Sequence, residues 1–569
     1  MNQLPKLPVP KLEETSPKFL QWCQPLLTEE EYQATATSIQ NFINTPESKV
    51  LQQKLQDRAQ EKNNWLYDYW QESYLGYRSN LPLNSNYFFL LPEITEKEPL
   101  KNATMFIAAA TQFYKLIQTK KLPQDMQKDI PLCMHEYKYL FATSRIPQKN
   151  KDQIKTATIS QHIIVLIKGQ IYRLQVLDAD LNPLTTIYQD LKYIQEHAEN
   201  GSGIGAFTAW KRDKWADAQI GLKSLGNDAT LDIVNQALFA VCLDEKVPDN
   251  LDQQLELALH ANFENRWFDK SLQFIFNTNG SIAFNIEHTM LDALPVLKLL
   301  NFIINHLDTS HTLSTPKQTP QNHSVQLLEF KLNTSIQQQL AMAKKDFATA
   351  SSDIYTKAFE FTGFGSNLIK KAQVSPDAFM QIAFQLTYES IFHEFGTIYE
   401  SVSTRQFSLA RTEAMRSLTS ELVAFIKGFK NQNISQTVKV ELFRKAAKAH
   451  IDRIMECQNG LGVERHFFGL AQIAATSLPS TTPTLNAIFQ SPGWQKLKYD
   501  KMSSSNCGSR DISFFGYGPT TLDGLGIGYT VLPEKIQICL TAHQKLQAQT
   551  KAFHQKLSQI LKDLLELLA

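Results

Sequence analysis

The chain has 569 residues, a length that predicts two large domains or a few smaller ones, since single domains usually hold about 100–200 residues. Apolar residues make up 43% and charged residues 20%, an ordinary composition for a globular protein with large cores. Lys plus Arg number 57 against 56 for Asp plus Glu, so the net charge is +1. This balance gives no electrostatic support for a nucleic-acid partner or for binding to an anionic membrane.

Cysteine usage and the N-terminus predict a cytoplasmic protein. The six cysteines are scattered and form no CxxC pair, so they favour reduced thiols over disulfides or a zinc site. Residues 1–12 have neither an apolar core nor an Arg-rich amphipathic stretch, so we expect no signal or transit peptide. No apolar run approaches the roughly 20 residues that would span a bilayer.

The first half alternates helical and extended patterns. Residues 28–77 read as helices, in which clustered aromatic side chains are predicted to form core: Trp65, Tyr67, Tyr69, Trp70, Tyr74 and Tyr77. Residues 158–176 predict a hairpin around Lys168-Gly169, and residues 272–286 predict another around Asn279-Gly280. An apolar helix is expected over 290–306.

The stretch 307–324 is dense in Thr, Ser, Pro and His and predicts a surface connection between domains. Beyond it, we expect strands over 326–332 and 355–361, a hairpin over 526–532 and 535–540, and helices over 335–347, 377–394, 413–427, 437–457 and 544–568. Helices and strands thus alternate in both halves, and the fold class is predicted to be α/β.

His288 is the first candidate for chemistry, because it follows the second strand of a predicted hairpin, where side chains can project into a cleft. A histidine there can take a proton from a hydroxyl or a thiol near neutral pH. Asp292 follows one helical turn later and could hold the local loop. The spacing alone is weak, and by itself it favours a structural histidine.

Further polar segments are open to a functional interpretation, but each taken alone favours a structural one. Ser503, Ser504 and Ser505 offer three consecutive hydroxyls that can donate to an oxyanion or a carboxylate, yet alone they read as a polar turn. The segments 399–405, 411–413 and 464–466 read as ordinary polar edges or helix starts. An arginine buried in any of them would need an anionic partner, either in the protein or in a ligand.

Taken together and in order, motifs along nearly the whole chain resemble those of the carnitine/choline acyltransferase family. They are Leu7-Pro8-Val9-Pro10-Lys11-Leu12, Asn64-Trp65, Gly205-Ala206-Phe207-Thr208, Asn265-Arg266-Trp267-Phe268-Asp269-Lys270 with Glu287-His288, Ser375-Pro376-Asp377, Tyr399-Glu400-Ser401, residues 460–470, and Gly518-Pro519 with Asp523-Gly524. The resemblance implies two similar α/β domains related to chloramphenicol acetyltransferase, with an active-site tunnel between them. It implies a helical segment 1–66 packing with the C-terminal domain, an N-terminal domain 67–325 carrying the catalytic histidine, and a C-terminal domain 326–569.

The resemblance also implies a mechanism and a carnitine site. His288 matches the family's general base, Asp292 belongs to its loop, and Ser505 matches the oxyanion donor. No acyl-enzyme intermediate is implied. The positions that match carnitine-binding residues are Tyr399, Thr412, Arg465 and Ser503. Arg465 is further expected to pair with Asp292.

For coenzyme A, which is a substrate rather than a cofactor, the resemblance assigns Lys370 and Asp377 near the adenosine end. Ser366 stands where the family has a second lysine, which puts full phosphate affinity in doubt, although Lys371 could compensate. Counting from Ser503 places Phe515 at the wall of the acyl pocket and favours short or medium chains. A shift of one residue would place Gly516 there and reverse that expectation.

The favoured hypothesis is therefore a monomeric carnitine O-acyltransferase acting on acyl-CoA and carnitine, with no metal and no further cofactor. A choline acyltransferase is the nearest enzymatic alternative. A catalytically silent acyl-CoA binder and a structural protein with an inherited fold are the others.

Overall fold

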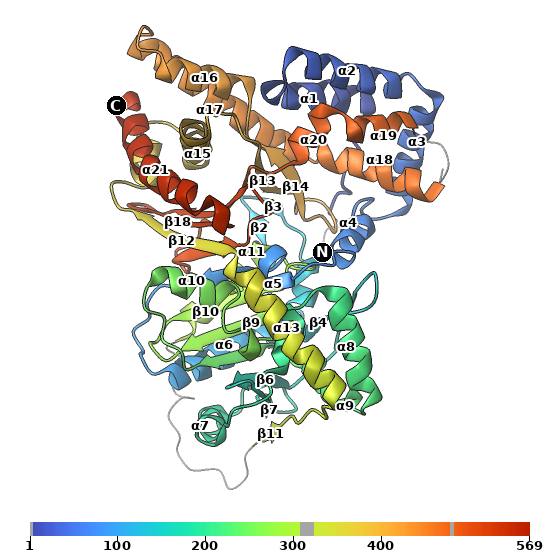
Figure 1. Cartoon of the computed structure of the whole chain (residues 1–569), viewed down its shortest axis with the longest axis vertical. Helices are drawn as coiled ribbons and strands as arrows, with labels where there is room; N and C mark the ends of the chain where they lie inside the picture. Colours follow the sequence, from blue (N-terminus) through green and yellow to red (C-terminus); the bar gives the residue numbers. More distant parts are fainter. Residues whose placement is uncertain (1–3, 308–323, 478–482) are drawn as a thin grey trace.

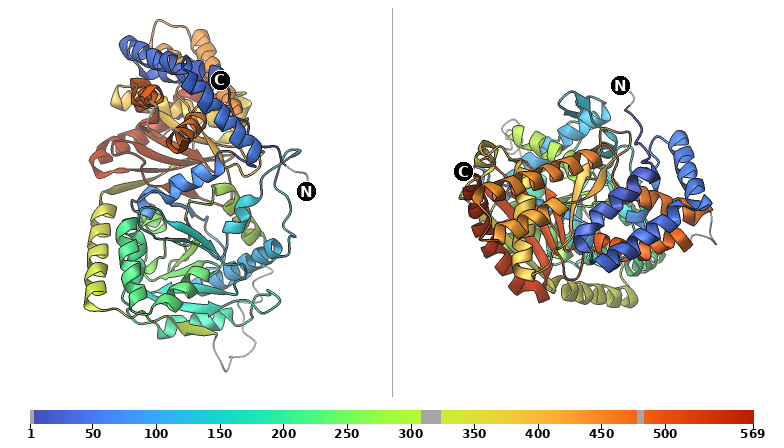
Figure 2. Two further views of the ribbon diagram at one scale, coloured as in Figure 1. Left: turned by 90° about the vertical axis from the view of Figure 1, so that its right-hand side faces the viewer. Right: turned by 90° about the horizontal axis from the view of Figure 1, so that it is seen from above.

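A computed structural model describes residues 4–307, 324–477 and 483–569. Two α/β halves lie one above the other (Figure 1), and the side view of Figure 2 separates them again. Each half is built on one large β-sheet with helices packed against it. The predicted α/β class is confirmed.

The sheet of the first half has eight strands in the order β11-β7-β6-β8-β9-β10-β1-β16. Their bounds are β1 (Tyr87–Leu90), β6 (His162–Ile167), β7 (Gln170–Gln175), β8 (Ala240–Asp244), β9 (Leu272–Asn277), β10 (Ile282–Ile286), β11 (Val325–Leu327) and β16 (Phe514–Tyr517). Strand β6 is buried throughout and apolar from Ile163 onward, as expected for a strand covered on both faces.

The sheet of the second half has six strands in the order β12-β18-β17-β15-β13-β14. Their bounds are β12 (Ile354–Phe361), β13 (Ile398–Ser403), β14 (Thr412–Arg416), β15 (Met502–Asn506), β17 (Leu525–Val531) and β18 (Ile536–His543).

The two sheets repeat one topology. In the first, β7-β6 is antiparallel, β6-β8-β9 is parallel, and β9-β10-β1 is antiparallel. In the second, β14-β13 is antiparallel, β13-β15-β17 is parallel, and β17-β18-β12 is antiparallel. The matched strands also occur in the same chain order. The two domains are therefore similar, as expected.

Helices cover each sheet. In the first half α6 (Pro99–Gln118) packs on α7 (Ile187–His197), on α11 (Ala293–Asn305) and on β9. In the second half α15 (Pro376–Phe392) packs on α21 (Gln547–Leu568), while α16 (Ser420–Lys430) packs on α17 (Gln436–Gln458). These faces enclose two separate cores, one rich in Phe from β9 and β10 and the other centred on β17 and β18.

The N-terminal helices lie against the second half. Helices α1 (Leu12–Cys23), α2 (Glu29–Ile43) and α3 (Pro46–Glu61) contact α18 (Glu464–Ser477), α19 (Pro483–Gln490) and α20 (Pro492–Lys498). Figure 1 shows this bundle, in blue and orange, beside the six-stranded sheet. A shared core that includes Phe19, Phe42 and Phe467 holds it together.

The division at residue 325 does not coincide with the sheets. Strand β11 pairs with β7, and α13 (Thr334–Ser352) runs along the first half, against α8 (Arg212–Ser224), before the chain enters β12. Conversely, β16 leaves the second half to pair with β1 at the far edge of the first sheet. Most of the predicted connection 307–324 lies outside the described residues.

All three predicted hairpins and the helices over 28–77, 335–347, 377–394, 437–457 and 544–568 are confirmed within a few residues. Two element predictions were wrong. Glu413–Arg416 belongs to strand β14, and the helix begins only at Ser420, whereas the strand expected over 326–332 is confined to 325–327. No helix among the described residues is long and apolar enough to cross a membrane.

Candidate active site

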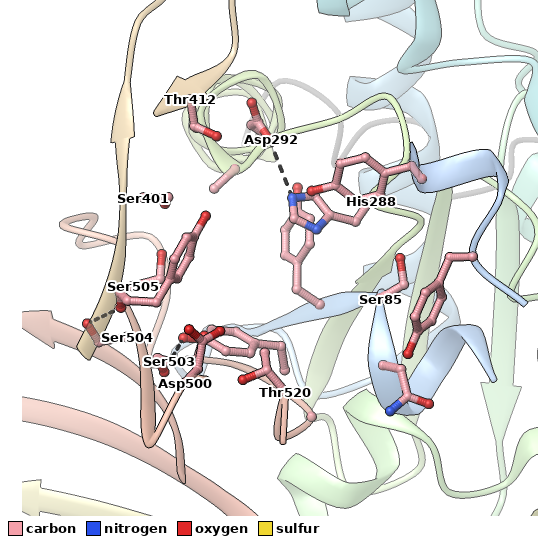
Figure 3. A pocket seen from close by; sticks show the side chains of 18 of the residues that line it. Ser85, His288, Asp292, Ser401, Thr412, Asp500, Ser503, Ser504, Ser505 and Thr520 are labelled. Atoms are coloured by element: carbon pink, nitrogen blue, oxygen red, sulfur yellow. Dashed lines mark hydrogen bonds and ion pairs between the residues drawn. The ribbon is translucent and has the colours of Figure 1, made fainter. Parts of the chain in front are cut away.

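A cavity of about 410 Å³ lies where the two sheets meet. It brings together eight predicted residues: His288, Asp292, Tyr399, Thr412, Arg465, Ser503, Ser505 and Phe515. Figure 3 shows His288 and Asp292 on one side, with Thr412 and the serines of β15 on the other. The cavity therefore receives side chains from both halves.

His288 follows β10, whose last residue is Ile286, and precedes α11, whose N-cap is Asp292. Its ring lies between the edges of Tyr74 and Tyr87, with centroids 5.4 and 5.2 Å away. The Nε2 atom is 3.4 Å from Asp292 Oδ1, and the side chain keeps 32% of its surface exposed. A proton on Nε2 directed at Asp292 leaves Nδ1 as the basic nitrogen.

Arg411 holds this loop from the second half. Its guanidinium binds Asp292 at 3.1 and 2.8 Å and donates to the backbone carbonyls of His288 and Thr289. Burial alone would raise the pKa of the Asp292 carboxyl, but the charge of Arg411 and the contact with His288 keep it well below its usual range. Asp292 is thus ionised and can orient the imidazole.

The expected pair between Arg465 and Asp292 is wrong, because Arg411 takes that place. The Arg465 guanidinium instead lies 3.7 Å from the centroid of the Trp70 ring. Its Nε donates to the Thr412 carbonyl at 3.4 Å, while its buried Nη2 has no hydrogen-bond partner among the described residues. Arg465 is only 5% exposed, and a buried donor without an acceptor is unfavourable.

Hydroxyl groups line the wall opposite the histidine. Strand β15 lies between β13 and β17 in parallel register, which sets Ser503 beside Tyr399. Ser504 donates to the Tyr399 carbonyl at 2.9 Å, so it anchors the strand. Ser503 and Ser505 line the same cavity. Backbone pairing on both sides holds these hydroxyls in place.

Phe515 lines the cavity from β16. On β16 it packs against Phe89 at 5.7 Å and Tyr517 at 5.6 Å between ring centroids, and it is 5% exposed. The neighbouring Gly516 points the other way, since a Cβ there would meet Cys539 Sγ at 2.7 Å and the Phe88 ring at 2.8 Å. Phe515 rather than Gly516 therefore lines the cavity.

Lys370 and Asp377 do not line this cavity. Lys370 is exposed on the short helix α14 (Ser366–Lys371), next to exposed Lys371, whereas Ser366 is buried at its start. Asp377 lies in the first turn of α15, where Asn506 donates to its Oδ1 at 3.1 Å. The six cysteines, all within the described residues, are buried and unpaired.

Sequence patterns missed several functional neighbours. Trp70 and Tyr74, which were assigned to the core, line the cavity, and Tyr77 is 40% exposed beside it. No sequence pattern singles out Glu136, whose Oε2 accepts a hydrogen bond from the backbone N–H of Asp292 at 2.7 Å. Burial and the negative charge of Asp292 raise the pKa of Glu136 to about 7. The signal that could have found it is an acidic residue between His135 and Tyr137.

Comparison with known proteins gives consistent matches. A carnitine O-acetyltransferase of Rattus norvegicus is 29% identical over 97% of this chain and 91% of its own length. A mitochondrial carnitine O-acetyltransferase of Saccharomyces cerevisiae is 28% identical over 100% and 88%. The mitochondrial carnitine O-palmitoyltransferase 2 of Rattus norvegicus is 30% identical over 93% and 87%. The profile described as Choline/Carnitine o-acyltransferase matches residues 7–559, so the chain belongs to this family of acyltransferases.

Proposed function

We propose that this protein moves an acyl group reversibly between coenzyme A and the hydroxyl of L-carnitine. The observation that carries the proposal is the nearly buried Arg465 guanidinium, a residue that lines the cavity that also holds His288. A carboxylate is the natural partner for such a donor. Carnitine presents a carboxylate together with the hydroxyl that His288 would activate. The relatives named for carnitine support the assignment.

His288 acts as the general base in this proposal. The imidazole removes the proton of the carnitine hydroxyl, and the oxygen attacks the thioester carbonyl of acyl-CoA. The tetrahedral intermediate collapses when the C–S bond breaks, and the imidazolium returns the proton to the sulfur of coenzyme A. The reverse reaction starts with the thiol. Ionised Asp292 stabilises the imidazolium, and no acyl-enzyme forms.

Ser505 donates to the oxyanion of the intermediate. It stands on a paired strand that faces the histidine across the cavity, so its hydroxyl needs little reorganisation. Loss of one such donor typically costs about 2.7–4 kcal/mol of transition-state stabilisation.

Arg465, Tyr399, Thr412 and Ser503 bind the carboxylate of carnitine. All four line the cavity, and β13, β14, β15 and α18 present them. A choline acyltransferase is the alternative, but choline lacks a carboxylate and would leave the Arg465 donor buried and unpaired. The geometry thus favours carnitine.

Coenzyme A binds toward α14 and α15 in this proposal, with Lys370 near its 3′-phosphate and Asp377 near its adenosine. Exposed Lys370 and Lys371 are free to reach a phosphate, which supports the assignment despite Ser366. Phe515 limits the acyl pocket to short or medium chains. We further propose that the protein acts as a monomer in the cytoplasm, with no cofactor besides this substrate.

A thiol-release assay tests the proposal. Acetyl-, octanoyl- and palmitoyl-CoA are each offered with carnitine or with choline, and free coenzyme A is measured. We expect release with carnitine, and faster release with acetyl- or octanoyl-CoA than with palmitoyl-CoA. Release only with choline would overturn the carnitine assignment, and no release with any pair would favour a silent acyl-CoA binder.

A further inference from the structure

Two acidic side chains and a histidine form a cluster beside β15, the strand that carries Ser503, Ser504 and Ser505. The cluster consists of Asp377 on α15, Glu400 on β13 and His450 on α17. One carboxylate oxygen of each acid and one ring nitrogen of the histidine lie within 4.8 Å of one another. Glu400 is 5% exposed and His450 is 3% exposed. The Asp377 side chain is 23% exposed. Among the described residues no Lys or Arg lies within ion-pair distance of either carboxyl group, although two ionised carboxylates side by side repel each other.

The hydrogen bonds of the cluster fix where its protons lie. The Tyr529 hydroxyl is 2.8 Å from Asp377 Oδ1 and 3.1 Å from Glu400 Oε1, but it has one proton to donate. Gln381 Nε2 donates to that hydroxyl at 3.1 Å, so the tyrosine oxygen already accepts. His450 Nε2 lies 3.0 Å from Asp377 Oδ2, while its Nδ1 has no partner. A proton on Nε2 of this imidazole fits the contact with Asp377.

We propose that Glu400 is held as a neutral acid and that a chain of hydrogen bonds from Glu400 through Tyr529 to Asp377 locks the serine strand in place. The Glu400 hydroxyl donates its proton to the Tyr529 oxygen, the Tyr529 hydroxyl donates to Asp377, and of the two carboxyl groups Asp377 alone keeps a charge. Each close contact then has one donor and one acceptor. Burial and the charge of Asp377 raise the pKa of Glu400 well above its ordinary value, which agrees with this assignment.

The cluster is connected to the cavity wall. Gln381 Nε2 also donates to Ser504 Oγ at 2.9 Å, and Ser504 donates to the carbonyl of Tyr399. Glu400 and Ser504 are paired neighbours on β13 and β15. Glu400 is thus a positioning residue that acts through Gln381 and Ser504. That part of the inference rests on the proposed roles of Ser503, Ser505 and Tyr399, whereas the protonation of Glu400 does not.

The first test compares the thermal unfolding of Glu400→Gln with that of the wild type from pH 5 to pH 9. A carboxyl group with a raised pKa in the folded state binds more protons there than in the unfolded chain, so the wild type loses stability as pH rises above about 4.5. Gln mimics the neutral acid and escapes this loss. We expect the Tm of the variant to exceed that of the wild type by about 1–3 °C at pH 8 and less at pH 5.

Glu464→Gln serves as the matched control, for which the change in Tm is expected to have the opposite sign. The Arg416 and Lys498 partners of Glu464 outweigh its burial and lower its pKa to about 2, so it contributes stability that is lost only in acid. We expect that variant to lower the Tm at neutral pH. If Glu400→Gln also lowers the Tm at pH 8, Glu400 is ionised, through a bound divalent cation or another partner, and the proposal is overturned.

The second test uses kinetics. We expect Glu400→Ala to lower kcat by about tenfold or more and Glu400→Gln to restore it to within about threefold of the wild type. Equal losses in both variants would overturn the positioning role while the unfolding data still decide the protonation. If the wild type itself shows no turnover, the proposed function has failed, and the unfolding comparison remains a valid test of the hydrogen-bond chain.

Discussion

Replacing Arg465 by Asn tests the recognition of the substrate's anionic end. The guanidinium is 5% exposed and stacks on Trp70, so solvent screens it little and its rotamer is already fixed. A hydrogen bond to a charged group contributes about 1.5–3 kcal/mol, which corresponds to roughly a 10- to 150-fold loss of affinity. We expect the KM for carnitine to rise by that factor, with a much smaller change in the KM for acetyl-CoA.

Thiol-release kinetics with carnitine and choline measure this effect within one protein. Choline has the hydroxyl but no carboxylate, so its turnover should stay unchanged or improve when the arginine is removed. The ratio of kcat/KM for carnitine over choline should therefore fall by at least tenfold. An equal rise in both KM values, for carnitine and for acetyl-CoA, would refute the role of Arg465 in carboxylate binding. A far-UV spectrum and a Tm like those of the wild type exclude misfolding.

The remaining predictions concern the base, its loop, the acyl wall and an acid behind the loop. His288→Ala should lower turnover by about 10²–10⁴-fold or more, while calorimetry still detects binding of coenzyme A. Substantial residual rate would mean that another residue is the base. Arg411→Gln leaves the mostly buried Asp292 carboxylate with only the 3.4 Å contact to His288, so denaturant unfolding should show a loss of about 3–5 kcal/mol, and unchanged unfolding would contradict the pairing. Phe515→Gly should raise the palmitoyl-to-acetyl ratio of kcat/KM by about tenfold or more, whereas a constant ratio would show that the wall lies elsewhere. Glu136→Gln should be more stable than the wild type at pH 8 by on the order of 3 kcal/mol but equal to it near pH 4.5. Burial and the charge of Asp292 raise the pKa of Glu136 to about 7, so between pH 4.5 and 7 the folded wild type keeps a proton that the unfolded chain has lost, and above pH 7 it carries a buried charge. A pH-independent difference in Tm would refute this.

The elements that locate the histidine could be predicted because their signals are local. Alternating apolar residues around Asn279-Gly280 specify a hairpin, and His288 follows directly from where that hairpin ends. The segment 413–416 failed for the opposite reason. Its residues fit a helical pattern as well as a strand pattern. Pairing with β13 at the edge of the second sheet makes the segment a strand.

The assignment of the two arginines could not come from sequence, because it depends on which half each side chain faces. Arg411 ends up against the Asp292 loop and Arg465 against Trp70, and the residues of each pair lie more than a hundred positions apart. The same holds for Glu136, whose raised pKa depends on an aspartate 156 positions away. Long-range electrostatics of this kind appear only once the chain is folded.

Strand β16 has a consequence for how the protein is made. Its four residues travel from late in the chain to cover β1, whose sequence Tyr87-Phe88-Phe89-Leu90 is at most 3% exposed in the finished fold. During synthesis β1 is therefore an unpaired, hydrophobic edge strand until more than 400 further residues have been made. Neither half can mature alone, and a chain truncated before Phe514 should aggregate rather than yield an independent N-terminal domain.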